Sequence, residues 1–206
     1  MPKQIDHEKR REQIAQATWR VISERGMEGA TVRNIAAEAG LSLGALRHYF
    51  STQDELLAYS MKLVKERVTA RIREILSLDL PPREKFIRTI LELVPMNREN
   101  MVEMEVWFAF TAYFRHKPGR FDMQDDGVYL GLQKLMDYAE QNGLLPASID
   151  KELETEKLYA LVDGLALHAY MQPQRLDGPR LERVLIHHLS GLMAAEKQSD
   201  APDRRS

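Results

Sequence analysis

The sequence contains no cysteine and no long apolar run. Without cysteine the chain can form neither a disulfide framework nor a thiolate metal site, which fits a reducing compartment. A transmembrane helix needs about 18 or more consecutive apolar residues, and the longest candidate, VWFAFTAYF, is far shorter. The first residues, MPKQIDHEKRREQ, lack the apolar segment of a secretory signal. These absences predict a soluble, cytoplasmic protein with no membrane partner.

Catalytic and cofactor motifs are also missing. The chain has no HExxH, no P-loop, no glycine-rich dinucleotide fingerprint and no GxSxG. The adjacent pair His187 and His188 points to two different helix faces, so it does not readily chelate one ion. Asp163 and His168 lie five positions apart and are poorly aligned on a helix. We therefore expect no enzyme, no catalytic residues, no metal site and no cofactor.

Charge is distributed unevenly along the chain. The net charge of the whole sequence is -2, but residues 1–73 carry 13 Lys and Arg against 9 Asp and Glu, a net charge of +4. The remainder therefore carries -6. A basic end on an acidic body indicates that the N-terminal region meets a polyanion, although random scatter could also produce an excess of four.

Helical periodicity dominates the sequence, since strand signals are sparse and apolar residues recur at spacings of three and four. We predict an all-α fold with an N-terminal three-helix domain and a larger helical domain. The expected helices cover about 6–25, 32–39, 43–49, 52–76, 82–95, part of 97–117, one ending near 141, 148–171 and 178–197. The segment around VWFAFTAYF could form a buried strand. Residues 97–117 contain no Gly or Pro and are too many for a typical strand, so we predict an interior helix.

Residues 31–50 form two short predicted helices joined by a tight turn at Gly40. Thr31 and Ser42 are suited to cap the two helices, and Thr52 with Glu55 has the spacing of a capping box at the next one. This is the helix-turn-helix arrangement, whose second helix enters the DNA major groove. An ordinary helical hairpin with a solvated face is the alternative.

A run of nearly 50 positions, from Arg11 to Leu57, resembles the N-terminal domain of the TetR family of transcriptional regulators. The positions that agree are Ile14, Ala17, Gly26, Thr31, Val32, Ile35, Ala36, Gly40, Gly44, Leu46, Tyr49, Phe50 and Leu56. The resemblance implies a dimeric DNA-binding repressor with a ligand pocket in the C-terminal domain. It also implies a set of DNA-binding residues: Thr31, Arg33, Ser42, Leu43, Gly44, Arg47, His48 and Tyr49.

Two positions depart from the family pattern. Arg47 stands where a tyrosine is usual, and Gln53 where a lysine is usual. Gln53 is expected to remove a phosphate contact, while Arg47 adds a cation that can reach a phosphate or a guanine edge. Arg10 and Arg11 either add phosphate contacts or form a solvated charge run.

The C-terminal segment KLYALVDGLALHAYMQP resembles the BetI-type C-terminal domain of this family. The helix predicted within residues 97–117, which we call the aromatic helix, corresponds in position to a part of the family's ligand pocket. The resemblance therefore implies a pocket along it, although aromatic residues on a helix more often belong to the core. Glu103 and Glu105 could orient a polar or cationic ligand group. The expected ligand-binding residues are Met101, Met104, Trp107, Phe108, Thr111, Tyr113, Asp163 and His168.

The last two helices are expected to pair with those of a second subunit, as the resemblance implies. Ala160 and Gly164 would permit close approach, and an apolar stripe runs along the last helix. The expected interface residues are Ala160, Gly164, Leu181, Leu185, His188 and Leu192. The alternative is that this stripe is intramolecular core.

These observations predict a DNA-binding domain over residues 1–51, a ligand-binding and dimerisation domain over 52–197 and a disordered tail over 198–206. The predicted function is a homodimeric transcriptional repressor that binds a palindromic double-stranded operator and is released by a small, mostly apolar effector. Two alternatives remain open: a DNA-binding activator without small-molecule control, and a helical binding or carrier protein.

Overall fold

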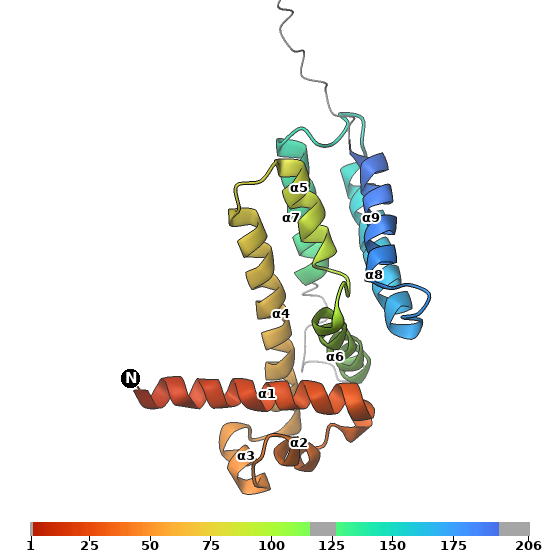
Figure 1. Cartoon of the computed structure of the whole chain (residues 1–206). Coiled ribbons are helices and arrows are strands. Elements are labelled where there is room, and N and C mark those ends of the chain that lie inside the picture. The colour runs from red at the N-terminus through yellow and green to blue at the C-terminus, as the bar shows by residue number, and fades with distance from the viewer. Residues whose placement is uncertain (1, 116–126, 194–206) are drawn as a thin grey trace, which may run out of the picture.

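The computed structural model describes residues 2–115 and 127–193, and regular structure in these ranges is entirely helical. This confirms the all-α prediction. The helices are α1 (Pro2–Gly29), α2 (Val32–Glu38), α3 (Leu43–Tyr49), α4 (Gln53–Ser77), α5 (Pro82–Leu91), α6 (Arg98–Phe114), α7 (Gly127–Gln141), α8 (Lys151–Met171) and α9 (Gly178–Leu192). Figure 1 shows α1 lying across one end of α4, with α2 and α3 beyond it, α5 and α7 beside α4, and α8 and α9 further away.

Helix α1 is broken at Gly26, which is where the sequence predicts its end. Gly26 has φ of 65° and ψ of -178°, a non-helical backbone conformation that only glycine adopts without strain. A short helical piece follows the break and reaches Gly29. The predicted end at this glycine is therefore confirmed, and the break redirects the chain toward α2.

Side-chain caps fix the start of the next three helices. The hydroxyls of Thr31, Ser42 and Thr52 accept backbone N–H groups at the beginnings of α2, α3 and α4. Glu55 completes the last cap by accepting from the backbone N–H of Ser51 at 2.9 Å, one residue earlier than the capping-box pattern predicts. The hydroxyl of Ser51, which also donates to Glu55, holds the pKa of this carboxyl below its usual value.

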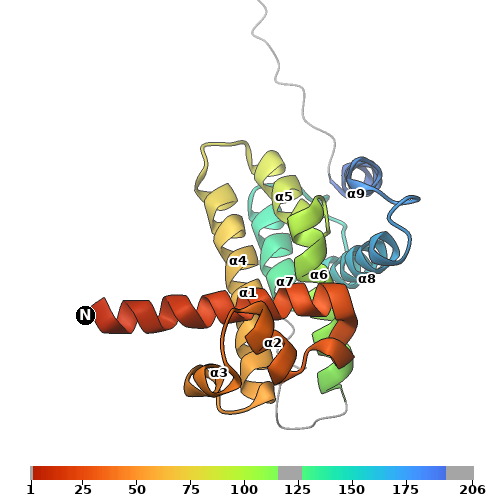
Figure 2. The ribbon, with the colours of Figure 1, turned by 60° about the horizontal axis from the view of Figure 1, so that its bottom comes forward.

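One hydrophobic core joins the N-terminal helices to the middle of the chain. Its buried members include Ile14 on α1 and Leu46 on α3, and also Val106, Phe110 and Phe114 on α6. Helix α6 packs directly against α1, which passes across it (Figure 1, Figure 2). The N-terminal domain therefore rests on α6 as well as on α4.

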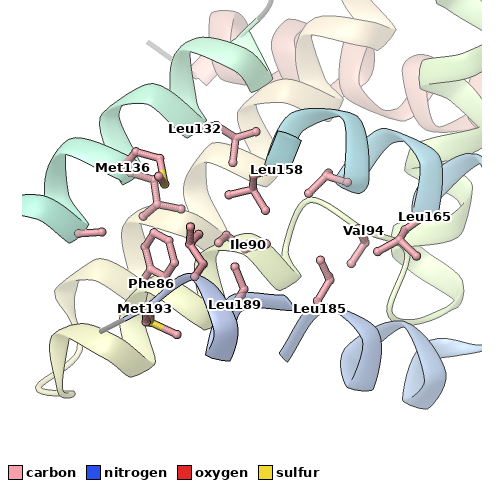
Figure 3. Close-up of a cluster of buried hydrophobic side chains, with 14 of the residues drawn as sticks. Phe86, Ile90, Val94, Leu132, Met136, Leu158, Leu165, Leu185, Leu189 and Met193 are labelled. Carbon is pink, nitrogen blue, oxygen red and sulfur yellow. The ribbon is translucent and has the colours of Figure 1, made fainter. Parts of the chain in front are cut away.

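A second core lies among α5, α7, α8 and α9. We use the term body for helices α5 to α9. Phe86 and Ile90 of α5 meet Leu132 of α7, Leu158 of α8 and Leu189 of α9 in one cluster (Figure 3). Because each of these helices buries one face in the cluster, their positions relative to one another are fixed by packing rather than by turns.

The predicted aromatic helix is confirmed as α6, although only one side of it is fully buried, at Glu103, Val106, Phe110 and Phe114. The predicted tail at 198–206 and the predicted end of the last helix at 194–197 lie outside the described residues. Among the helices that are described, none combines the length and the apolar character required to cross a membrane.

Candidate DNA-binding and effector sites

Helix α3 turns its apolar side chains inward and its cationic side chains outward. Leu46 is completely buried and Phe50, which follows the helix, is 1% exposed. Arg47 and His48, which lie between them in sequence, are exposed. Within the described residues neither Arg47 nor Arg33 forms an ion pair. The guanidinium groups of both arginines are therefore available to an external anion.

The start of α2 places Thr31 and Arg33 on the surface. The Thr31 hydroxyl accepts the backbone N–H of Asn34 at 3.2 Å, and the Asn34 side chain donates to the carbonyl of Gly29 at 2.9 Å. These bonds hold the N-terminus of α2 against the end of α1. Thr31 and Arg33 are both exposed there, beside backbone N–H groups that favour anions.

Gly44 is exposed near the start of α3. A Cβ atom added at this position would meet no atom within 4 Å, so packing inside the chain does not require glycine. Alanine would favour the helix by about 1 kcal/mol. The absence of a side chain leaves the helix backbone open to close approach by another molecule. Ser42 beside it is exposed and Leu43 is half-buried.

An aromatic cluster ties α1 to the recognition helix. The ring of His7 lies 4.8 Å from that of Tyr49 and 6.3 Å from that of His48, measured between centroids. The rings of His48 and Tyr49 lie 5.6 Å apart in an edge-on arrangement. Sequence reasoning did not single out His7, because its contact with α3 joins residues about forty positions apart.

Gln53 and Arg11 both have roles inside the molecule. The Gln53 side chain donates to the carbonyl of Ala30 at 2.9 Å and so ties α4 to the loop before α2. The Arg11 guanidinium lies 4.6 Å from the Phe50 ring and 4.5 Å from the Tyr59 ring, with a carboxylate of Glu55 at 3.6 Å. Arg11 is thus engaged within the domain and is not a solvated charge.

A cavity of about 590 Å³ lies among α4, α5, α6, α7 and α8. We call it the large cavity. It contains three of the predicted ligand-binding residues: Met104, Trp107 and Asp163. Lys65 of α4 also lines it and carries its ammonium 5.9 Å from the centre of the Trp107 ring. Most of its apolar wall was not predicted; among those residues are Val64, Val68, Ile72, Leu93, Leu135 and Tyr138.

Arg71 joins three helices at the wall of the large cavity. Its guanidinium donates to both oxygens of Glu103 on α6, at 3.1 and 2.7 Å, and at 2.7 Å to Glu92, which caps the C-terminus of α5. The hydrogen bonds to Glu103 raise the pKa of Arg71 above its already high usual value. Glu103 is 4% exposed. A buried carboxylate of this kind is stable only because a cation pairs with it.

The other predicted ligand-binding residues do not line this cavity. Phe108 and Tyr113 line a second pocket that also involves α1 and α8. Met101 packs at the edge of the body core, Thr111 is half-buried, and His168 is exposed. The predicted set is therefore divided, because α6 presents different residues to two different spaces.

The predicted interface residues on α9 are mostly buried in the chain's own core. Leu181 and Leu185 are completely buried and Leu192 is 7% exposed, all within the core of the single chain. The stripe thus packs on the molecule's own helices, which was the stated alternative. Ala160 is exposed and Gly164 is half-buried on α8. His188 is half-buried, and desolvation lowers its pKa.

A different apolar surface is exposed on the last two helices. Large apolar side chains stand exposed in this region: Leu153, Leu167, Tyr170 and Met171 on α8, and Ile186 on α9.

Across the described residues, no three His, Asp or Glu side chains are grouped so that they could hold a metal ion.

Comparison with known proteins matches both parts of the chain to family models. Residues 14–59 match a model described as bacterial regulatory proteins, tetR family, and residues 82–194 match the C-terminal model of BetI-type transcriptional repressors. The HTH-type transcriptional regulator PksA of Bacillus subtilis (strain 168) is 62% identical over 192 residues, covering 93% of this chain and 94% of that protein. The HTH-type transcriptional regulator BetI of Vibrio campbellii is 30% identical over 193 residues, covering 91% and 93%.

Solved structures agree with this fold. A transcriptional regulator from Rhodococcus sp. Rha1 aligns with a TM-score of 0.75 at 28% identity, covering 88% of this chain and 95% of that chain. A transcriptional regulator from Saccharomonospora viridis, solved in complex with choline, aligns with a TM-score of 0.77 at 20% identity, covering 91% and 100%. At 20% identity, the similarity to the Saccharomonospora viridis regulator concerns the fold alone.

Proposed function

Because the chain belongs to the TetR family of bacterial transcriptional regulators, we propose that it represses transcription as a homodimer on a palindromic operator and is released by a small, mostly apolar effector. Its family makes it a DNA-binding regulator and not an enzyme. Residues 1–51 are proposed as the DNA-binding domain and 52–197 as the ligand-binding and dimerisation domain. A repressor acts where its operator lies, which favours the cytoplasm.

The observation that carries the proposal is the two-sided character of α3. Leu46 and Phe50 anchor the helix, while Arg47 and His48 are exposed and no described carboxylate neutralises Arg47. In a helix-turn-helix protein the second helix enters the major groove, where an arginine can bond a guanine edge with two hydrogen bonds. We assign base contacts to Arg47 and His48.

The remaining predicted DNA-binding residues surround this helix. Tyr49 is held by the rings of His7 and His48, so its hydroxyl is suited to donate to a phosphate. Thr31 and Arg33 at the start of α2 are proposed to contact the backbone. Ser42, Leu43 and Gly44 complete the surface at the start of α3. The bare Gly44 backbone allows the helix to lie close to DNA.

We propose that the dimer forms through the exposed face of α8 rather than through the buried stripe of α9. Leu153, Ala160 and Leu167 recur every seven residues, so they share one helix face. Gly164 lies four residues after Ala160, and Met171 lies four residues after Leu167, so both extend the same face. Ile186 is the exposed apolar residue on α9. A two-fold dimer would place two copies of α3 on the two half-sites of a palindrome.

The large cavity is the proposed effector site. Its volume of about 590 Å³ falls within the range of about 300–1,000 Å³ typical of small-molecule sites. Its walls are mainly aliphatic and aromatic, which favours a mostly apolar effector. Met104, Trp107 and Asp163 are the predicted residues that we retain for this site.

Helix α6 links the large cavity to the DNA-binding domain. Met104 and Trp107 line the cavity, while Val106 and Phe110 of the same helix are buried in the core that holds α1. Helix α4 also spans both regions, from Thr52 to the cavity. An effector that displaces either helix would change the placement of the two copies of α3. It releases DNA only if it binds the DNA-incompetent form more tightly.

An effector titration with and without operator tests this coupling. Metabolites that raise the thermal midpoint of the protein would be titrated into free protein and into its complex with operator. We expect weaker effector binding in the complex, by the same factor by which the effector weakens DNA binding. Met104→Ala should weaken effector binding several-fold and leave DNA affinity unchanged. Equal effector affinity in the two titrations would refute release through this cavity.

A further inference from the structure

A second pocket, of about 490 Å³, lies where the end of α1 meets α6 and α8. We call it the junction pocket. Ser23 of α1, Glu105, Phe108 and Tyr113 of α6, and Tyr170 of α8 line it. None of these residues lines the large cavity. Since the adjacent Met104 faces that cavity while Glu105 faces the junction pocket, the two spaces take residues from different sides of α6.

Glu105 gives the junction pocket a negative charge. Its carboxylate is half-buried and accepts a hydrogen bond from the Ser23 hydroxyl. No Lys, Arg or His among the described residues forms an ion pair with it. Glu103, two positions earlier, is fully paired with Arg71. A neutral hydroxyl leaves the Glu105 charge uncompensated, so the carboxylate is available to a cationic hydrogen-bond donor.

Aromatic rings stand beside this carboxylate. The rings of Phe108 and Tyr170 approach with centroids 5.7 Å apart and planes tilted by 41°. Tyr113 adds a third ring to the lining. Ring faces attract organic cations and also cover apolar bodies. The pocket thus combines a carboxylate acceptor with aromatic surface in a space large enough for a small molecule.

We propose that the junction pocket binds a protonated primary or secondary amine that carries an aromatic or apolar body. The ammonium N–H groups donate to Glu105, and the body lies against Phe108 and Tyr170. A quaternary ammonium ion binds less tightly, because it has no N–H to donate to the carboxylate. The site is separate from the proposed effector cavity, and its occupancy does not depend on that proposal.

Such a ligand would bridge the DNA-binding domain and the body. Ser23 belongs to α1, which carries the core of the DNA-binding domain, whereas Glu105 and Tyr170 belong to helices of the body. Binding across this boundary stabilises the relative placement of α1 and α6 seen here. If the DNA-bound form has the same placement of α1 and α6, the ligand raises operator affinity. If the DNA-bound form has a different placement, the ligand lowers it.

The test uses 2-phenylethylamine as the probe and the full-length protein. Isothermal titration would measure its affinity for the parent and for Glu105→Gln, with Glu99→Gln as the matched control. Glu99 is an exposed carboxylate on the same helix that does not line the junction pocket. We expect Glu105→Gln to weaken binding about tenfold or more, because the amide oxygen still accepts a hydrogen bond from the ammonium but no longer carries a negative charge. Glu99→Gln should leave the affinity unchanged.

Further comparisons separate this site from the large cavity. The neutral analogue 2-phenylethanol and the quaternary ion choline should each bind at least several-fold more weakly than 2-phenylethylamine. Met104→Ala, which alters only the large cavity, should leave 2-phenylethylamine binding intact. The proposal is overturned if the parent binds no 2-phenylethylamine at millimolar concentration. It is equally overturned if Glu105→Gln binds it as well as the parent, or if Met104→Ala abolishes binding while Glu105→Gln does not.

Discussion

The surface of α3 and the wall of the large cavity place arginine in opposite environments. Arg47 stands exposed on a short helix without an ionic partner among the described residues. Arg71 is partly buried and bonds Glu103 on α6 and Glu92 at the end of α5. An exposed arginine costs little stability and can be used for an external anion, whereas Arg71 is needed to compensate a buried charge. The exposure of an arginine and its ionic partners therefore indicate whether it is available to a ligand or needed for stability, which its residue type alone does not.

Apolar residues divide in the same way between α9 and α8. Leu185 is completely buried in the chain's own core, while Leu167 is 42% exposed on α8. Both lie in the segment proposed for dimerisation, yet only the exposed one has a face left for a second subunit. Burial in the single chain is therefore the reason for proposing the α8 stripe, and not the α9 stripe, as the interface.

The largest expected effect comes from placing a charge on each stripe. Leu185→Glu should prevent stable folding, because it puts an unpaired carboxylate into the core at a cost of more than about 4 kcal/mol. Leu167→Glu should leave each chain folded and convert the dimer to monomers. Circular dichroism and sedimentation velocity would measure both. If Leu167→Glu remains dimeric, the α8 face does not belong to the interface. If Leu185→Glu is folded but monomeric, the α9 stripe does belong to it.

The next effect separates a partly buried ion pair from an exposed one. Arg71→Ala leaves Glu103 buried and unpaired, so the free energy of unfolding should fall by about 3–5 kcal/mol. Lys62→Ala on the same helix breaks an exposed pair with Glu66 at 3.4 Å and should cost about 0–1 kcal/mol. Urea unfolding measures both variants. Similar losses in the two would show that the Arg71 network is not structural.

A smaller effect is expected at the joint between α4 and the loop before α2. Gln53→Ala removes the hydrogen bond to the Ala30 carbonyl and should lower the free energy of unfolding by about 1 kcal/mol. Gln53→Lys should restore the residue usual in the family and strengthen operator binding through a phosphate. Loss of operator affinity in the lysine variant would mean that the hydrogen bond to Ala30, by positioning α3, contributes more to operator binding than a phosphate contact from the lysine does.

The smallest expected effect is on the pH dependence of stability. Desolvation lowers the pKa of His188, whose Nε2 is buried without a hydrogen-bond partner. The unfolded chain then binds the proton more readily, so the contribution of His188 to stability is present above its unfolded pKa and is lost as the pH falls through about 6.5 and below. Urea unfolding of the parent between pH 7.5 and 5.5 should show this loss. An equally steep loss in His188→Gln would assign it to other groups.

The local structure of the proposed DNA-binding surface could be predicted largely from sequence because local rules determine it. Thr31 and Ser42 begin two helices, Gly40 has φ of 65° in the turn, and Leu46 and Phe50 define the inward side. Once these are placed, the exposure of Arg47 follows from helical periodicity. The contact of His7 with Tyr49 does not follow, since it depends on how far α1 extends and how it crosses α3.

The body could be predicted only in part because its sites combine distant helices. Periodicity identifies the stripe containing Leu185, but it cannot say whether the stripe meets the same chain or another copy. Arg71 and Glu103 are 32 positions apart, and no local pattern pairs them. Likewise Trp107 and Phe108 are adjacent in sequence but line different spaces. The aromatic composition of α6 indicated a ligand site without indicating two pockets.

The most direct test of the account is operator binding by a double variant, Arg33→Ala with Arg47→Ala. Operator DNA would be selected from random duplexes with the parent, and affinities measured over a range of salt concentrations. Arg175→Ala, an exposed arginine after α8 that bonds Gln172, is the matched control. We predict that the double variant remains a folded dimer, loses at least about 1–3 kcal/mol of operator affinity per half-site and shows a shallower salt dependence, while the control matches the parent. A folded, dimeric double variant that binds operator as tightly as the parent would contradict the assignment of this surface to DNA.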